Sequence, residues 1–321
     1  MTTEIEKLNN EGVNLFLAGH FKKAISKYKE VLKLHPNYAT TLNNLGMCFL
    51  QEKEFEKAED YFNKAIELKE SSTYYLNLGH AQANQGKFAE AEENYLKSVQ
   101  MDANSLMAHK SLGTLYQKQQ RYSESIAVWE TIRSNLSNDP LYNVELAKDF
   151  IQLKEYQNAL SVLLDAEHYE KNRHITWYYM ALIHFHQKNF GLAEKKLNQA
   201  IGLEPDNSDF RALLAVIYLG LNDIQNAVKQ WNYILNLHPD NVKIRIDKAV
   251  ALLSYGFKDQ AMSALNETLK RDPENEKARF YKSLIKIELN KNDTSAIETL
   301  KDISKGTTAF SKRANELLQK L

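Results

Sequence analysis

The sequence predicts an all-α solenoid of antiparallel helix pairs, and three observations carry this prediction. Only 11 glycines and 5 prolines occur in 321 residues, which is few for an all-β chain with many turns. Apolar residues recur with helical spacing. A small residue also returns at steps of 33 or 34 residues, as Ala24, Ala58, Ala91, Ser125, Ala159, Ala193, Ala227 and Ala261.

Three further series of residues recur with the same step, and this periodicity predicts that the chain consists of internal repeats. A second small-residue series comprises Gly12, Gly46, Gly79, Gly113, Ala147, Ala181, Ala215, Ala249 and Ser283. A bulky series comprises Tyr28, Phe62, Tyr95, Trp129, Leu163, Leu197, Trp231 and Leu265. Prolines follow the step at Pro205, Pro239 and Pro273, and Pro36 matches their phase. The length alone would predict two domains of ~150 residues, but a repeat array grows by stacking instead.

Each period reads as two helices, as the stretch 174–207 illustrates. One amphipathic helix is indicated by Trp177, Met180, Ala181 and His184, and a second by Ala193, Leu197, Ala200, Ile201 and Leu203. The polar residues 187–189 between them form a short turn, and Pro205 ends the second helix. We expect Gly12 to face Ala24, because small side chains let helix axes approach closely, and Tyr28 to fill space against the neighbouring unit.

These residues resemble the tetratricopeptide repeat along nearly the whole chain. The small-Leu-Gly segment of that family appears as Asn44-Leu45-Gly46, Asn77-Leu78-Gly79 and Ser111-Leu112-Gly113. The resemblance implies a right-handed superhelix, with an array over 1–309 and units at 5–38, 39–71, 72–105, 106–139, 140–173, 174–207, 208–241, 242–275 and 276–309. The ninth unit is degenerate, and residues 309–321 are expected to form a C-terminal capping helix. Units two to five lack the terminal proline, so we expect less regular junctions there.

Composition excludes several classes of protein. Lys plus Arg and Asp plus Glu number 41 each, so no electrostatic attraction to nucleic acid or anionic membrane is expected. No run of about 18 apolar residues exists, which predicts no transmembrane segment. The single cysteine, Cys48, rules out an internal disulfide and is compatible with a reducing compartment. The polar start does not read as a secretory signal, and we expect a cytoplasmic protein.

No motif predicts catalysis, a cofactor or a metal. His184 and His186 are two residues apart, which points them away from each other on a helix. Gly79, Gly86 and Lys87 lack the spacing of a phosphate-binding loop, and each glycine has a repeat-level explanation. Cys48 lies beside Gly46 and is interpreted as a packed thiol. We therefore expect no enzyme.

In tetratricopeptide repeat proteins the first helices of successive units line a concave groove that binds peptides or helices. By this resemblance an asparagine-rich half of the groove comprises Asn9, Asn10, Asn43, Asn44, Asn77 and Asn84. A side-chain amide both donates and accepts, so it can hold the backbone of an extended peptide. The alternative is that asparagine merely tolerates a half-exposed helix position. The lysines and arginine with which some family members bind a terminal carboxylate are missing from units one to three.

The second half of the same face is apolar. It comprises Val144, Ile151, Ile175, Tyr178, Leu182, Phe185, Val216, Leu219, Ile246, Val250 and Leu253. A contiguous apolar patch usually marks a binding site, and an amphipathic helix is the natural occupant. The alternative is tight curvature, in which these residues bury one another or pack on the capping helix.

The sequence thus predicts a protein–protein interaction scaffold or adaptor without chemistry of its own. Two alternatives stay open: a regulatory protein that senses a peptide by changing curvature, and a self-assembling scaffold in which the apolar face receives another copy. A homo-oligomer is compatible with the second alternative.

Overall fold

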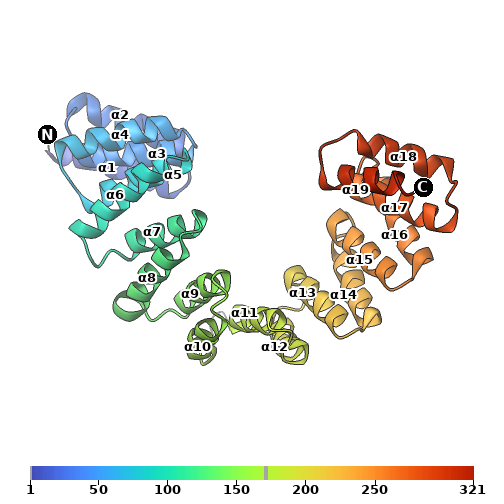
Figure 1. The fold of residues 1–321 in the computed structure, drawn as a ribbon. Helices are drawn as coiled ribbons and strands as arrows, with labels where there is room; N and C mark the ends of the chain where they lie inside the picture. The colour runs from blue at the N-terminus through green and yellow to red at the C-terminus, as the bar shows by residue number, and fades with distance from the viewer. Residues whose placement is uncertain (1, 170–172) are drawn as a thin grey trace. The chain divides into compact units, whose positions relative to one another are not determined.

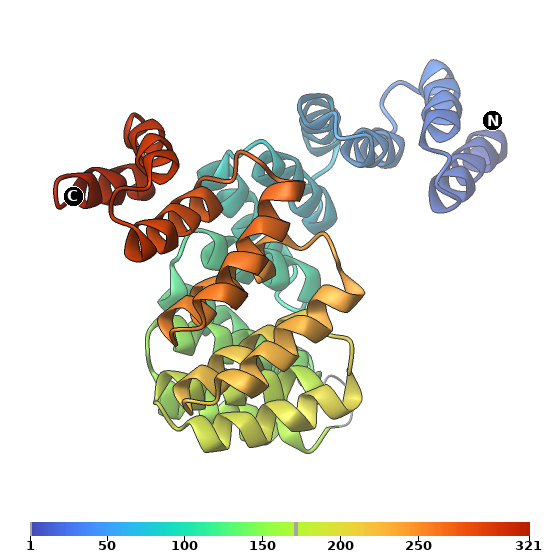
Figure 2. The same ribbon diagram turned by 90° about the vertical axis from the view of Figure 1, so that its right-hand side faces the viewer.

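The computed structural model describes residues 2–169 and 173–321, and these are almost entirely helical (Figure 1). The described residues form nineteen α-helices and one five-residue π-helix, with no β-strand among them. The chain divides into two compact units, Met1–Ala166 and Glu167–Leu321. Each unit is an array of consecutive helices that pack on their sequence neighbours (Figure 2).

The helices of the first unit are 10 to 16 residues long. They are α1 (Thr2–Leu17), α2 (Phe21–Leu34), α3 (Ala39–Gln51), α4 (Phe55–Leu68), α5 (Ser72–Asn84), α6 (Phe88–Met101), α7 (Leu106–Lys118), α8 (Tyr122–Thr131), α9 (Leu141–Gln152) and α10 (Tyr156–Glu167), with the π-helix η1 (Ile132–Leu136) after α8.

The helices of the second unit are 10 to 14 residues long. They are α11 (Arg173–His186), α12 (Phe190–Leu203), α13 (Ser208–Gly220), α14 (Ile224–Leu237), α15 (Val242–Ser254), α16 (Lys258–Arg271), α17 (Glu276–Leu289), α18 (Thr294–Ser304) and α19 (Ala309–Leu318).

In the first eight of the nine helix pairs, the turn between the two helices has one residue with a left-handed backbone. Its φ lies between 59° and 82° at Gly19, Lys53, Gly86, Gln120, Lys154, Lys188, Asn222 and Gly256. Only glycine adopts this conformation without strain between Cβ and the backbone. Because five of the eight residues are not glycine, most of these turns are held by the packing of the two helices that they join.

The first and second helices of a pair meet through a glycine and an aromatic ring. In α3 and α4, a Cβ added to Gly46 would lie 2.6 Å from Cε1 of Phe62. Gly12, Gly79 and Gly113 oppose Tyr28, Tyr95 and Trp129 in the same way. The glycines were expected to face the alanine of the second helix, but their nearest neighbour is mainly the aromatic ring four residues farther on.

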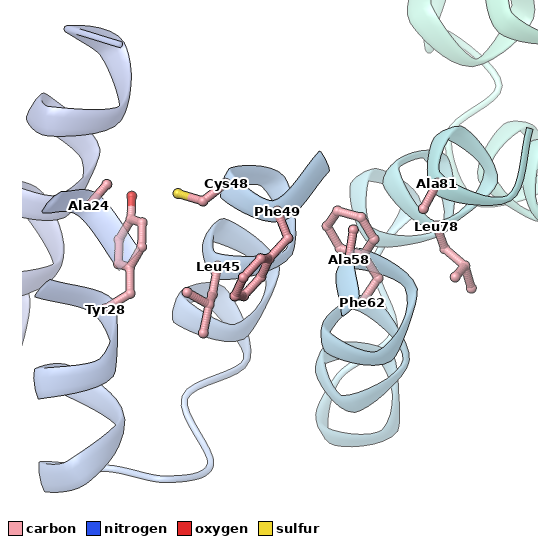
Figure 3. Packing of buried hydrophobic residues seen from close by; sticks show 9 residues of the cluster. All are labelled: Ala24, Tyr28, Leu45, Cys48, Phe49, Ala58, Phe62, Leu78 and Ala81. Atoms are coloured by element: carbon pink, nitrogen blue, oxygen red, sulfur yellow. The ribbon is translucent and has the colours of Figure 1, made fainter. Parts of the chain in front are cut away.

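The same rings also build the junctions between pairs. Tyr28, Phe62, Leu45, Cys48 and Leu78 belong to one buried cluster that runs from α2 to α5 (Figure 3). The aromatic ring therefore has two roles, since it packs on the glycine of its own pair and on side chains of the next pair. This double contact makes each helix pair dependent on its neighbour for a closed core.

Two arginines one period apart join consecutive pairs in the second unit. Nε of Arg211 donates to the carbonyl oxygen of Pro205 at 2.6 Å, and Arg245 donates to that of Pro239. Each proline follows the end of a helix, and the arginine donates to the proline carbonyl, which has no partner within that helix.

The junction after α8 is less regular, and its unit lacks the terminal proline. Here α8 ends at Thr131 and the chain continues as η1 before Pro140 precedes α9. The side chain of Asn143 crosses to α10, where it donates to the carbonyl oxygen of Val162 at 2.8 Å.

At the end of the second unit, α19 covers part of α17 and α18. Phe310 lies against Phe280 and Tyr281, with ring centroids 5.4 and 6.0 Å apart. Ala314 is fully buried in the same cluster as Leu300.

Candidate partner-binding groove

A hollow of about 490 Å³ opens in the second unit between α11, α13, α14 and α15. Four residues of the predicted apolar face line it, namely Tyr178, Val216, Leu219 and Val250. The repeat step brings these residues together, because equivalent positions of successive first helices fall on one side of the array. We call this feature the apolar hollow.

The wall of the apolar hollow at α11 is aromatic. The ring of Tyr178 stacks on Phe210 with centroids 5.1 Å apart and an interplanar angle of 25°. Phe210 is buried, so it fixes the orientation of the tyrosine. Burial also raises the pKa of Tyr178, and its hydroxyl is neutral under physiological conditions. Opposite, Val216 is 39% exposed, so a binding partner can reach the side chain.

The other residues predicted for the apolar face lie outside this hollow. Ile175, Leu182, Phe185 and Leu253 are half-buried, and the Phe185 ring packs against Phe190 on the partner helix of its pair. Val144, Ile151 and Ile246 are 2%, 7% and 4% exposed and lie in the core. We leave these three buried residues out of the proposed contact surface.

Charged residues at the apolar hollow were not selected from the sequence. Asp209, Lys243 and Asp247 line it together with the apolar side chains. Asp247 accepts from Nζ of Lys277 at 3.3 Å, so part of this charge is balanced within the chain. Asp209 and Lys243 occupy the second position of their repeats, which is one of the inward positions, so the repeat register could have located them.

The asparagines of the first unit are largely engaged with each other and with neighbouring helices. Thr41 donates to Oδ1 of Asn9 at 2.8 Å, and Asn77 donates from Nδ2 to Oδ1 of Asn43 at 2.9 Å. Asn9, Asn43 and Asn77 are buried. These amides therefore stabilise contacts between first helices. Each has the hydrogen-bond partner that a buried polar group requires.

The remaining asparagines are more accessible. Asn44 is half-buried, whereas Asn10 and Asn84 are exposed. Asn84 donates to the carbonyl oxygen of His80 at 2.8 Å, one turn earlier in α5. Only these three amides can contribute to a peptide-binding surface without local rearrangement.

No set of three or more His, Cys, Asp or Glu residues in 2–169 and 173–321 could hold a metal ion. Cys48 is fully buried, and burial raises the pKa of its thiol to about 12. Glu59 accepts hydrogen bonds from Gln82, Gln85 and Lys87.

In the part of the chain that the structure describes, no helix has the length and apolar character needed to cross a bilayer.

Comparison with known families agrees with the helix pairs and their period. Tetratricopeptide repeat profiles match residues 7–71, 72–105, 144–210 and 189–242, which together make up more than half of the chain. The chain belongs to the tetratricopeptide repeat family. Its all-α array of repeated helix pairs is the architecture of that family.

Similar proteins include members of larger assemblies. The BBSome complex member BBS4 from Bos taurus is 26% identical over 259 residues, which cover 69% of this chain and 49% of that protein. The chain thus spans about half the length of this relative.

Two solved structures show the same fold. The Cut9–Hcn1 hetero-tetramer of the APC/C aligns with a TM-score of 0.53 at 17% identity, covering 87% of this chain and 55% of that one. The C-terminal part of a TPR repeat-containing protein from Cytophaga hutchinsonii aligns with a TM-score of 0.62 at 20% identity, covering 74% and 97%.

Proposed function

We propose that this tetratricopeptide repeat protein is a non-enzymatic scaffold or adaptor that binds an amphipathic helix of a partner protein in the apolar hollow. The observation that carries the proposal is the convergence of Tyr178, Val216, Leu219 and Val250, from three first helices, on one hollow. Apolar side chains three, four and seven residues apart on a partner helix form a stripe that fits such a surface.

The charges at the hollow specify the orientation of the partner rather than most of the affinity. Asp209 is exposed and makes no ion pair within the described residues, so it is available to a basic residue at the edge of the partner helix. Membership of the bovine relative in a complex supports a role in assembly. The single buried thiol of Cys48 suits a reducing compartment, and we propose that the protein acts in the cytoplasm.

The test is affinity purification from source cells with the wild type, Val216→Lys and Leu203→Lys, followed by binding measurements with the recovered partner. Leu203 is 55% exposed at the end of α12 and lies outside the hollow, so it is the matched control. We expect Val216→Lys to weaken binding of a helical partner segment at least tenfold, and Leu203→Lys to leave it unchanged. Equal binding by all three proteins would exclude the apolar hollow as the site.

A photo-crosslinking residue at position 216 tests the contact directly. We expect it to label the apolar face of the partner helix, whereas the same group at position 203 should not. Labelling of a second copy of this chain would instead support the self-assembling scaffold.

A further inference from the structure

A second hollow, of about 360 Å³, lies in the first unit between α5, α6 and α7. Its lining includes His80, Asn84, Phe88, Lys110, Thr114 and Lys118, and no Asp or Glu belongs to the lining. This differs from the apolar hollow, which has two aspartates. We call it the cationic hollow.

The two lysines of the cationic hollow are not neutralised within the chain. Within the described residues, the side chains of Lys110 and Lys118 make no ion pair or hydrogen bond, and Nζ of Lys118 lies 4.7 Å from the centroid of the Phe88 ring. Some other lysines of this unit have acidic partners, such as Lys87 with Glu59 at 2.8 Å and Lys148 with Glu145 at 2.6 Å. What distinguishes Lys110 and Lys118 is that both line one hollow whose lining contains no carboxylate.

The rest of the lining is neutral and offers both hydrogen bonds and apolar surface. Nε2 of His80 and Oγ of Ser111 are 2.8 Å apart, and burial lowers the pKa of His80, so the imidazole is neutral. Met107 is 54% exposed, and it lines the hollow together with Thr114, which offers a hydroxyl group. A ligand can thus combine a carboxylate with an aliphatic stem.

The spacing of the two lysines sets the spacing of the ligand's charges. Lys110 and Lys118 are eight residues apart on α7, which corresponds to ~12 Å along the helix axis. An extended peptide covers that distance in about three to four residues, at ~3.3 Å per residue. Two acidic side chains with that separation can therefore each pair with one of the two long lysine side chains.

We propose that the cationic hollow binds an extended acidic peptide whose Glu or Asp residues are four positions apart and so lie on one face of the peptide, one paired with Lys110 and the other with Lys118. The inference extends the proposed scaffold role to the first unit. It can be tested independently of the apolar hollow, because the two hollows share no residue and differ in charge.

Fluorescence anisotropy with a synthetic probe tests this proposal. The probe is a fluorescein-labelled, C-terminally amidated ten-residue peptide with glutamates four positions apart in a Ser/Gly/Leu background, and its comparison peptide carries glutamine at those places. We expect the acidic peptide to bind at least tenfold more tightly at low salt, and this preference to shrink as salt rises. Equal affinity for the two peptides, or no binding, would overturn the proposal.

Variants locate the site on the full chain. Lys110→Gln with Lys118→Gln should reduce the affinity for the acidic peptide at least tenfold, while circular dichroism stays unchanged. Lys243→Gln removes a lysine from the apolar hollow and should leave the affinity within twofold, as should Val216→Lys. An unchanged affinity in the double variant would exclude the cationic hollow, whatever the outcome for the helix partner at Val216.

Discussion

Gly46 lies directly under the ring of Phe62, so that an added Cβ would be 2.6 Å from Cε1 and 2.7 Å from Cδ1. The two residues are on opposite helices of one pair, and the aromatic ring occupies the space that the missing side chain leaves. The same relationship joins Gly12 to Tyr28. It explains why glycine, a poor helix former, recurs inside the first helices of the first unit.

Gly46→Ala is expected to destabilise the protein by about 1–3 kcal/mol, because the methyl group overlaps a ring that cannot move away from a packed core. Gly191→Ala, in α12, is the control, since nothing lies within 4 Å of its added Cβ. There we expect a gain of up to about 1 kcal/mol from helix propensity. Urea unfolding followed by circular dichroism measures both, and a Gly46→Ala protein as stable as the wild type would contradict the packing argument.

Lys53→Gly is expected to stabilise the chain by about 1 kcal/mol, because φ at Lys53 is 62° and L-residues other than glycine are strained there. The reverse change, Gly86→Ala, should destabilise by a similar amount, since φ is 79° and no atom lies within 4 Å of the new Cβ. Thermal unfolding of the two variants measures these effects. The melting temperatures of the two variants are expected to shift in opposite directions, and a shift in the same direction would refute the explanation.

Asn43→Ala is expected to cost about 1–3 kcal/mol, because it leaves the buried Nδ2 of Asn77 without its acceptor. Asn84→Ala, on the exposed end of α5, should change the free energy of unfolding by less than about 0.5 kcal/mol. Chemical denaturation of both variants tests whether the buried asparagines are structural. Equal losses of stability in the two variants would show that the hydrogen bond between Asn43 and Asn77 contributes less to the free energy of unfolding than its burial predicts.

Ile246→Lys is expected to unfold the second unit locally, because Ile246 is 4% exposed and a buried ammonium has no partner there. Val216→Lys should keep its helix content and melting behaviour, since the side chain is 39% exposed. Hydrogen exchange of α13 and α15 distinguishes the two. Loss of protection in Val216→Lys would show that this residue belongs to the core rather than to a binding surface.

Asp149→Asn is expected to raise stability at neutral pH. Asp149 is 1% exposed, and burial raises its carboxyl pKa above the ordinary 3.8, with Glu145 adding to the rise while Ser125, Gln117 and Lys148 oppose it. The native state then retains a proton that the unfolded state releases, so the free energy of unfolding falls as pH increases through the interval above 3.8. The urea midpoint of Asp149→Asn should therefore exceed that of the wild type by more at pH 7 than at pH 4. An equal difference at the two pH values would contradict the expected pH dependence.

The repeat register could be predicted from the sequence because helix packing restricts the size of the residues that define it. Ala24 and Ala193 are fully buried where second helices meet their partners, and a larger residue at either position would separate the helices. Their recurrence, with Gly46 and Phe62 in the other series, predicts helix pairs and their period. Such positions depend on local packing between sequence neighbours, which is why a single chain displays them.

Exposure on the inward face could not be read in the same way. Val144 and Val216 are both valines in the apolar series, yet one is 2% and the other 39% exposed. Asn77 and Asn84 are both asparagines of α5, yet Asn77 is buried against Asn43 and Asn84 is exposed. Each pair shares its residue type, and all four residues belong to the predicted inward face, so neither property could distinguish core from surface.

The amino-acid pattern alone predicts the helix pairs, their 34-residue period and the residues that pack them, because a solenoid repeats the same short-range contacts in every unit. The folded chain was needed to show that Tyr178, Val216 and Val250 converge on one hollow and that Lys110 and Lys118 lack acidic partners in another. Accessibility and ion pairing depend on side chains from several helices at once, and small rotations between pairs change them without changing the repeat pattern.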